Sequence, residues 1–383
     1  MPSILRDIFG AFYLAFFNAN LMTFNKLYTI SCHVGKQKSK IRIWTDNFIW
    51  GLKFKEVNNL YYVYGMDLIG KDVNSFIAYS EFRVLRNILN IRAHENRSNT
   101  KYCFNYLALA RDKFVFSQFC KSLDIPHPKT YGLTNYNSVL WFVNGKDTFK
   151  EYDSVLNFDH LDVFCKEISG GGGRQSFQLK VEKGKIFIDD KISNLKTLAD
   201  KLSKERFLIQ QRVTQHKTIH KIYPESINTI RLMTFLKSNG SVEIFDAYMR
   251  FGDEGRKVDN LGQGGIGVGV NIQTGQLNST GFCKKPGRMR IVKGIHNYTN
   301  VKFANIKVPF YKEAVEYATK LHKAMYGMPS MGWDIALTPN GPVFLEAGED
   351  WEIGSVQCHR GGVKENFYEL HGFALDTKLR RVR

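Results

Sequence analysis

The amino-acid sequence predicts an α+β protein with a mostly helical N-terminal region, and three stretches of the chain support this prediction. Residues 1–105 are rich in aromatic and basic side chains and contain few turn signals, which favours helices. Short apolar strands then alternate with turns and one helix over residues 161–213. Two β-hairpins follow, at residues 227–251 and 332–346. With 383 residues, the chain is long enough for two or three domains.

The chain is strongly basic, because 54 Lys and Arg residues against 36 Asp and Glu residues give a formal net charge of +18. This charge favours an acidic partner, such as a nucleotide, a nucleic acid, an anionic membrane surface or an acidic polymer. No RNP-like or helix-turn-helix signature is present, so we expect no nucleic-acid partner. The six cysteines form no CxxC pair, which indicates neither a disulfide framework nor a zinc site and favours a cytoplasmic location.

The apolar segment at residues 8–17 is too short for a transmembrane helix, since Asn18 and Asn20 interrupt it. Asp7 argues against the basic front of a signal peptide. Two interpretations remain. The segment is either a helix packed in the protein core, or a helix on the inner face of a membrane that gives the chain a peripheral membrane association.

Residues 106–160 are predicted to lead from the helical region to the first set of strands. They include a predicted helix at residues 111–123, for which Asp112 is the capping residue. The helix ends at the sequence Ile125-Pro-His-Pro128, because proline cannot continue a helix.

Four consecutive glycines at residues 170–173 lie between two predicted strands, with Lys166 before them and Arg174 after them. Glycine lets the backbone fold closely over a ligand and direct its N–H groups at it. With cations on both sides, the ligand we expect is a phosphate chain. A flexible linker is the alternative, but linkers are Gly/Ser-rich over longer spans. We therefore predict that residues 161–214 form a lid with a glycine flap.

Residues 215–383 are predicted to form a C-terminal lobe with a basic tail, and its last hairpin carries two acidic residues. Asp334 and Glu346 lie on the two arms, so their carboxylates are expected side by side. Two carboxylates held this close repel each other unless a cation joins them. Mg²⁺ fits this position, because it prefers oxygen ligands that water and nucleotide phosphates complete.

From about residue 111 to residue 355, the order of motifs resembles that of the ATP-grasp superfamily, whose members bind ATP between two α+β lobes. Five features carry the resemblance: Asp112-Lys113 followed by Ile125-Pro-His-Pro128; Lys166 with the glycine flap; the strand Phe207–Val213; the series Arg231, Arg250, Asn260 and Gly264-Gly265; and the hairpin from Gly332 to Glu346. Within the superfamily, the chain is most similar to the sugar-transfer-associated ATP-grasp proteins of polysaccharide biosynthesis, which are related to glutamate-adding and teichuronopeptide-type ligases.

The resemblance implies a role for each matching position. The residues expected to bind ATP are Lys113, Lys166, Gly170, Gly171, Gly172, Gly173, Gln210, Gln211, Arg212 and Val213. The residues expected to steady the acyl intermediates are Arg231, Arg250 and Asn260, and the residues expected to bind Mg²⁺ are Asp334, Glu346 and Asp350.

One position departs from the superfamily pattern. Members usually have an Asn two residues after the metal-binding Glu, where this chain has Gly348. Strand alternation would place Asp350 on the same face as Glu346, so we expect Asp350 to complete the metal shell, with Glu349 as the alternative.

Two histidine motifs have simpler interpretations. His216 and His220 have the spacing of a helical zinc pair, but Pro224 and the strand before them argue against such a pair; His216 is either a ribose contact or an ordinary surface histidine. The pair Cys358-His359 has no supporting acid in the sequence and is expected to be structural.

The resemblance implies an ATP-dependent carboxylate–amine ligase that forms an amide through an acylphosphate. The expected partners are an acidic sugar or polysaccharide acceptor, such as a uronic acid of a capsule or O-antigen, and an amino acid or amine. An ATP-grasp kinase or phosphotransferase and a non-catalytic ATP-binding protein are the alternatives. The sequence does not predict the oligomeric state.

Overall fold

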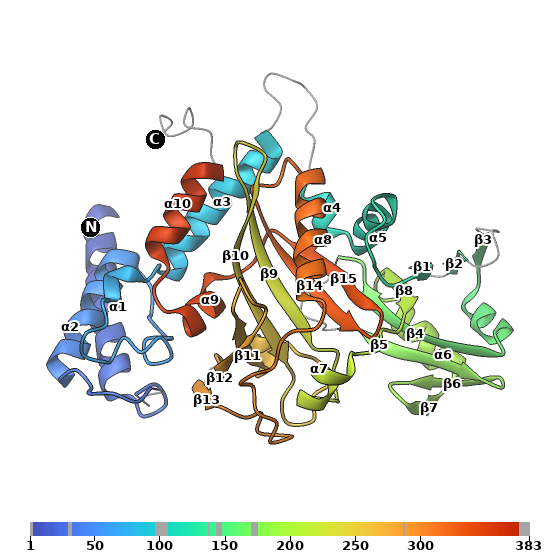
Figure 1. Ribbon diagram of the computed structural model, residues 1–383, viewed down its shortest axis with the longest axis horizontal. Coiled ribbons are helices and arrows are strands. Elements are labelled where there is room, and N and C mark those ends of the chain that lie inside the picture. Colours follow the sequence, from blue (N-terminus) through green and yellow to red (C-terminus); the bar gives the residue numbers. More distant parts are fainter. Residues whose placement is uncertain are drawn as a thin grey trace.

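Two antiparallel sheets and a set of N-terminal and C-terminal helices make up the protein, which confirms the predicted α+β class (Figure 1). This computed structural model describes residues 3–29, 33–95, 106–136, 138–142, 148–169, 175–285 and 288–374.

The first sheet has eight strands and contains the predicted lid. In spatial order, its strands are β3 (Thr148–Lys150), β2 (Ser138–Trp141), β1 (Thr130–Asn135), β8 (Phe207–Gln211), β4 (His160–Glu167), β5 (Phe177–Glu182), β6 (Lys185–Ile188) and β7 (Lys191–Ser193). The strands predicted at residues 161–213 are therefore present, but β1–β3 from the segment 106–160 belong to the same sheet. The division of the chain into domains stays a prediction.

The second sheet has seven strands and contains both predicted hairpins. In spatial order, its strands are β13 (Arg290–Lys293), β12 (Leu277–Cys283), β11 (Ile266–Val270), β10 (Val242–Phe251), β9 (Thr229–Leu236), β14 (Ser330–Thr338) and β15 (Gly341–Gly348). Helix α8 (Tyr311–Ala324) covers one face, where Ile230, Leu232 and Trp333 join its apolar side chains in one core.

The other face of the second sheet is covered at one end by helices from both ends of the chain (Figure 1). These helices are α3 (Tyr79–Glu95), α9 (Ile353–Arg360) and α10 (Lys364–Ala374). Phe235 and Phe245 of the sheet, Trp351 and Phe82 share one apolar core there. The side chain of Gln357 joins the two ends of the chain, because its Oε1 accepts from the Ile77 N–H at 2.8 Å and its Nε2 donates to the Ile77 carbonyl at 3.1 Å.

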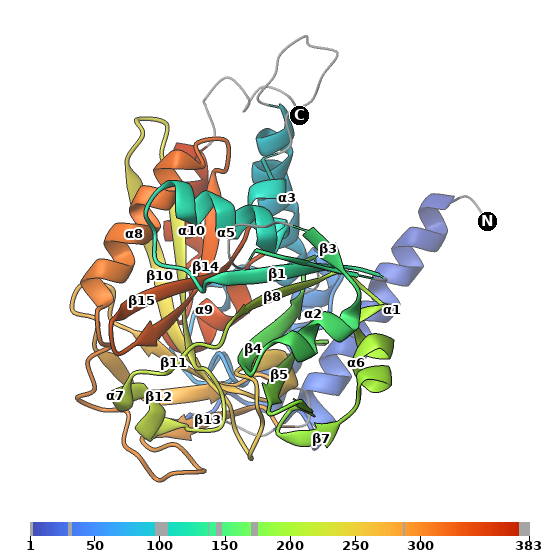
Figure 2. The same cartoon turned by 90° about the vertical axis from the view of Figure 1, so that its right-hand side faces the viewer.

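Helices α1 (Ser3–Phe24) and α2 (Lys40–Phe54) form a helical hairpin at the edge of the molecule, and the N-terminal end of α1 extends away from the rest (Figures 1 and 2). Among the described residues, no helix has the length and apolar character needed to cross a membrane. The remaining helices are short: α4 (Ala108–Arg111), α5 (Lys113–Ser122), α6 (Leu195–Leu202), α7 (Lys217–Ile222) and the 3-10 turns η1 (Val73–Ser75), η2 (Tyr152–Asn157) and η3 (Leu261–Gln263). The N-cap of α6 is Asn194, whose Oδ1 accepts from the Thr197 N–H at 2.9 Å.

Candidate active site

Three charged side chains form a row across neighbouring strands of the seven-stranded sheet. Asp334 on β14 lies directly opposite Arg231 on β9 and directly opposite Glu346 on β15. Residues that are directly opposite in antiparallel strands share one face of the sheet. The expectation that Asp334 and Glu346 lie side by side is therefore confirmed, although a bulge follows Asp334 in the pairing of β14 with β15.

Two arginines hold Asp334. Arg231 contacts both of its carboxylate oxygens, with 2.9 Å from Nη2 to Oδ2, and Nη2 of Arg250 lies 3.0 Å from the same Oδ2. Burial alone would raise the pKa of Asp334, but the two guanidiniums outweigh burial and lower this pKa to about 2. Burial opposes the charge of Arg231 as well, yet Asp334 raises the pKa of Arg231 above its usual value. All three groups therefore stay charged at neutral pH.

Asp259 and Thr229 extend this cluster, and the sequence did not single them out. Oδ2 of Asp259 accepts from the Thr229 N–H at 2.9 Å and from its hydroxyl at 2.6 Å. Arg250 in turn donates from Nη2 to the Thr229 hydroxyl oxygen at 2.6 Å, and its Nε lies 3.4 Å from Asp259. Asp259 directly precedes the predicted Asn260, which is the only signal in the sequence that could have found it.

Two lysines approach Glu346, one from α5 and one from the eight-stranded sheet. Lys113 begins α5, and its Nζ lies 3.8 Å from Oε1 of Glu346; Nζ of Lys166 on β4 lies 4.0 Å from the same oxygen. Lys166 also donates to the Leu345 carbonyl at 3.0 Å. Both lysines are buried. The site therefore lies where the two sheets meet, with α4 and α5 packed beside β15 (Figure 1).

Burial makes the positive charge of Lys166 energetically unfavourable. Burial lowers its pKa to about 8, and Lys113 contributes in the same direction, while Glu346 opposes the shift. An anionic ligand beside Lys166 would relieve this cost. Helix α5 holds Lys113 in place because Asp112 caps it, accepting from the Phe114 and Val115 N–H groups at 2.9 Å each, as the sequence predicts.

The structure describes only some of the other residues expected to bind ATP. Gly170, Gly171, Gly172, Gly173 and Arg174 lie outside the described residues. The side chain of Gln210 is buried, and its Nε2 lies 3.4 Å from the Pro128 carbonyl and from the Thr130 hydroxyl.

Gln211 is the last residue of β8, so the backbone of Arg212 and Val213 continues beyond this strand, as an adenine-binding edge requires. The Arg212 side chain forms an ion pair with Asp162 at 3.2 Å. The roles of these residues stay predictions.

Asn260 has a local task in this structure. Its Oδ1 caps η3 by accepting from the Gly262 and Gln263 N–H groups at 2.8 and 3.3 Å. At Gly265, an added Cβ would lie 2.7 Å from the Phe251 carbonyl oxygen and 2.8 Å from that of Asp259, so this turn has no room for a side chain. This tight turn holds Asp259 beside Arg250.

The structure separates the third predicted metal ligand from the other two. Strand β15 ends at Gly348, so strand alternation does not reach Asp350. Asp350 forms an ion pair with Arg86 at 2.5 Å, and the buried Glu349 pairs with Arg111. Arg86 and Arg111 were not singled out in the sequence, because each lies more than 200 positions away from its partner.

The described residues contain no group of three His, Cys, Asp or Glu side chains that could hold a metal ion. Asp334 is already bound by two guanidiniums. Glu346 is more than a third exposed, and Mg²⁺ on a nucleotide often uses only one or two carboxylates. Glu346 therefore fits a magnesium ligand, whereas Asp334 and Asp350 do not in this arrangement.

The two histidine motifs have structural tasks. His216 caps α7, its Nδ1 accepting from the Thr218 N–H at 3.1 Å, and His220 is exposed. Nε2 of His359 lies 2.8 Å from the buried Asp246, and Cys358 is buried. The expectation that no acid supports Cys358-His359 is therefore wrong, because β10 brings Asp246 to His359, and the structural interpretation of this pair stays a prediction.

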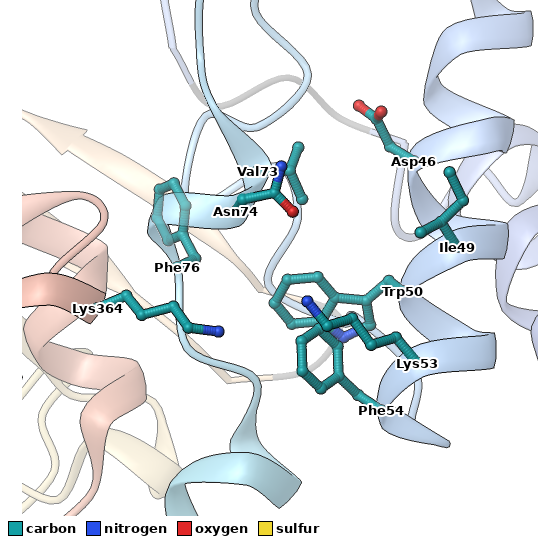
Figure 3. A pocket seen from close by; sticks show the side chains of 9 residues that line it. All are labelled: Asp46, Ile49, Trp50, Lys53, Phe54, Val73, Asn74, Phe76 and Lys364. Carbon is teal, nitrogen blue, oxygen red and sulfur yellow. The ribbon is translucent and has the colours of Figure 1, made fainter. Parts of the chain in front are cut away.

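A small pocket lies apart from this cluster, between α2, the η1 segment and α10 (Figure 3). Its lining includes Trp50, Phe54, Phe76 and Lys364. Trp50 and Phe76 are buried against the shared core and present no open stacking surface. No residue predicted for the site lines this pocket.

The sequence comparison with protein families gives a decisive match. The model of the family described as "Sugar-transfer associated ATP-grasp" matches residues 92–367, which is most of the chain. The chain belongs to this family. The α+β ATP-grasp fold expected from the resemblance is thereby established, and the two sheets that meet at Lys166 and Glu346 are its two lobes. A search of curated proteins finds no match.

Solved structures with some likeness to this ATP-grasp protein are synthetases and ligases. N5-carboxyaminoimidazole ribonucleotide synthetase from Thermotoga maritima is 18% identical, with a TM-score of 0.34, over 64% of this chain and 43% of that chain. D-alanyl-alanine synthetase A from Vibrio cholerae is 13% identical, with a TM-score of 0.38, over 70% and 65%. L-amino acid ligase from Bacillus licheniformis is 10% identical, with a TM-score of 0.37, over 74% and 53%. The chain thus spans about two fifths to two thirds of their lengths.

Proposed function

We propose that this protein is an ATP-dependent carboxylate–amine ligase that forms an amide through an acylphosphate. The observation that carries the proposal is the row Arg231, Asp334 and Glu346, toward which Lys113 of α5 and Lys166 of the eight-stranded sheet converge. Such a set of fixed charges suits phosphoryl transfer, in which the protein mainly positions the reactants and stabilises moving negative charge. Membership of the ATP-grasp family supports ATP as the phosphoryl donor.

The proposed reaction has two steps. A substrate carboxylate oxygen attacks the γ-phosphorus of ATP, the bond to ADP breaks, and an acylphosphate forms. The amine nitrogen then attacks the acyl carbon, phosphate leaves with the electrons of the C–O bond, and the nitrogen loses a proton.

In this proposal, the two pairs of cations have different tasks. Lys113 and Lys166 hold the phosphates, because their ammonium groups face the junction between the lobes as point charges. Arg231 and Arg250 bind the carboxylate and then the oxyanion, since a guanidinium presents paired donors to planar oxygen pairs. Glu346 would hold the Mg²⁺ that accompanies ATP, and this ion would neutralise phosphate charge when bound.

For the substrates, we propose a uronic acid of a cell-surface polysaccharide or its precursor as the acyl donor and an amino acid or amine as the acceptor. The net charge of +18 supports an acidic polymer, because a basic surface attracts it over long distances. Use of ATP and of a sugar precursor points to the cytoplasmic side of the membrane.

The test is an assay of ADP and phosphate release with glucuronic or galacturonic acid and a panel of amino acids. We expect ADP and phosphate in equal amounts, only when both a carboxylate and an amine are present, with an amide detected by mass spectrometry. The variant Lys166→Met should lose activity, whereas Lys204→Met, at an exposed position in the lid, should retain it.

Two results would replace this proposal with another function. ADP release without phosphate, together with a phosphorylated sugar, would indicate a kinase. Absence of nucleotide binding in calorimetry with ATP and Mg²⁺ would indicate a non-catalytic protein, which the missing side chain at Gly348 would then explain.

A further inference from the structure

Helix α1 has two unlike faces. Ala15, Ala19 and Met22 are fully buried against the rest of the N-terminal region. The side of the helix that faces away from them is exposed and aromatic. The residues of this aromatic face are Phe9, Tyr13, Phe16 and Phe17, of which Phe9 is 61% and Tyr13 75% exposed. Ile8 and Phe12 are also exposed but lie in line with Ala15 and Ala19, and the rings of Phe12 and Phe16 lie 6.3 and 5.9 Å from those of Phe48 and Trp44 on α2. Core packing, one of the two interpretations of this segment, therefore accounts for only half of the helix.

The exposed apolar surface continues beyond the helix. Leu27, Val34 and Ile41, in and after the turn that joins α1 to α2, are 68%, 87% and 81% exposed. Single exposed apolar residues are normal, but a contiguous set of this size marks a surface that contacts something apolar.

The charges around this surface are mostly positive, although Asp7 beside Ile8 is exposed. No charged residue occurs between Ile8 and Asn25, whereas residues 1–55 contain eight Lys and Arg against two Asp. Asp46, one of these two acids, is buried and paired with Lys38 at 2.8 Å and with Arg42 at 3.1 Å. Lys26, Lys36 and Lys40 are exposed at the C-terminal end of α1 and along the turn.

We propose that the aromatic face of α1, with the lysines of the adjoining turn, docks on an anionic membrane surface. Aromatic side chains favour the interface between lipid headgroups and acyl chains, and lysines beside them bind anionic headgroups. Because no described helix can span a bilayer, α1 lies in the plane of the interface with its aromatic face toward the acyl chains.

A lipid surface fits these residues better than a second protein does. Protein–protein interfaces are depleted in lysine, whereas an anionic bilayer attracts it. The N-terminal end of α1 also projects from the body of the molecule, which leaves its aromatic face free to approach a flat surface (Figure 2). The inference does not depend on the proposed ligase activity, although it would place the enzyme beside lipid-linked glycans.

The test is co-sedimentation of the full chain with vesicles of phosphatidylcholine mixed with phosphatidylglycerol, and with vesicles of phosphatidylcholine alone. We expect binding to the mixed vesicles, weaker binding at high salt, and little binding to the neutral vesicles. The variant Phe9→Ser/Tyr13→Ser should lose most binding. The variant Lys36→Glu/Lys40→Glu should weaken it about thirtyfold or more, because each lysine near the surface contributes about a factor of five.

Matched controls are available in and beside the eight-stranded sheet. Phe149 and Ile192 are 58% and 73% exposed there, and Lys185 and Lys204 are exposed. The variants Phe149→Ser/Ile192→Ser and Lys185→Glu/Lys204→Glu carry the same chemical changes and should bind vesicles as the unaltered protein does.

Three results would overturn the proposal. The first is no binding of the unaltered protein to the mixed vesicles at low salt. The second is an equal loss of binding in the control variants. The third is a dimer in sedimentation velocity that Phe9→Ser/Tyr13→Ser abolishes while vesicle binding is absent, which would assign the aromatic face to a second copy of the chain.

Discussion

The arginine pair and the lysine pair of the active site are held in opposite ways. Arg231 and Arg250 come from neighbouring strands of one sheet and contact the same carboxylate, Asp334, at 3.0 Å or less. Lys113 and Lys166 approach Glu346 only at 3.8 and 4.0 Å, and burial lowers the pKa of Lys166. A carboxylate of the protein itself thus stabilises the charges of the arginines, whereas Lys166 is a destabilising charge that a phosphate would compensate.

The largest expected effect is that of Asp334→Asn, which removes the shared counter-charge of the arginine pair. Arg231 would then lack a carboxylate and Arg250 would keep only Asp259, at 3.4 Å, so we expect the free energy of unfolding to fall by about 3 kcal/mol or more. Urea denaturation measures this change. Glu225→Gln is the control, because it removes an exposed ion pair with Lys257 and should cost less than about 1 kcal/mol. Equal losses in the two variants would mean that Asp334 has no special structural task.

Lys166→Met should have the opposite effect on stability. Replacing the buried ammonium with an apolar side chain of similar length should raise the free energy of unfolding at neutral pH, by up to about 3 kcal/mol, since one pKa unit corresponds to about 1.4 kcal/mol. The same variant should bind ADP at least about tenfold more weakly. Urea denaturation and calorimetry measure the two quantities. A variant that is both less stable and unchanged in nucleotide affinity would contradict this account of the lysine pair.

A finer test is the pH dependence of the difference in the free energy of unfolding between Lys166→Met and the unaltered protein. The pKa of Lys166 is about 8 in the folded protein and 10.5 as the ordinary value, so between these values the unfolded chain binds the extra proton. Stability therefore rises with pH in this window, and the cost of the charge is fully present only below about pH 8. The advantage of Lys166→Met over the unaltered protein should thus be constant below about pH 8 and shrink above it. Taking the difference between the two proteins cancels the titration of tyrosines and cysteines.

The smallest expected effect is that of Gly348→Asn. This variant adds an amide side chain two residues after Glu346, which the two lysines approach. An added Cβ there would have only the Asp350 nitrogen within 4 Å, at 3.9 Å, so the backbone leaves room for a side chain. The new amide oxygen would lie on the same strand face as Glu346, and we expect Mn²⁺ affinity in the presence of ADP to rise by about a factor of five, as one extra ligand bond allows. Electron paramagnetic resonance measures free Mn²⁺. Gly348→Ala is the control, and equal affinities for the two variants would show that no metal approaches this position.

The sequence predicts those parts of the site that depend on neighbours along the chain. A short turn joins β14 to β15, and this turn alone is enough to bring Asp334 beside Glu346. The cap at Asp112, which holds Lys113, is equally local. Sequence patterns over a few residues determine such features, because the chain has few other conformations to choose from.

The features that the sequence does not predict depend on pairing between distant strands and on where a strand ends. Arg231 meets Asp334 because β9 pairs with β14, and these residues are 103 positions apart. Asp350 pairs with Arg86 instead of continuing the strand face of Glu346, because β15 ends two residues earlier, and no residue type marks that end. The sequence does not predict the exposure of the aromatic face of α1 either, because the composition of this face suits burial in a core as well as contact with a membrane surface.

The core shared by the two ends of the chain has a consequence for biosynthesis. Phe82 on α3 packs against Trp351 and Phe367, which the ribosome adds more than 260 residues later. The N-terminal helices therefore emerge long before the side chains that cover them are made, and their apolar surface stays uncovered until those residues emerge. At the usual pace of 5–20 residues per second, this interval is on the order of ten seconds or more, during which a chaperone or a membrane would have access to that surface.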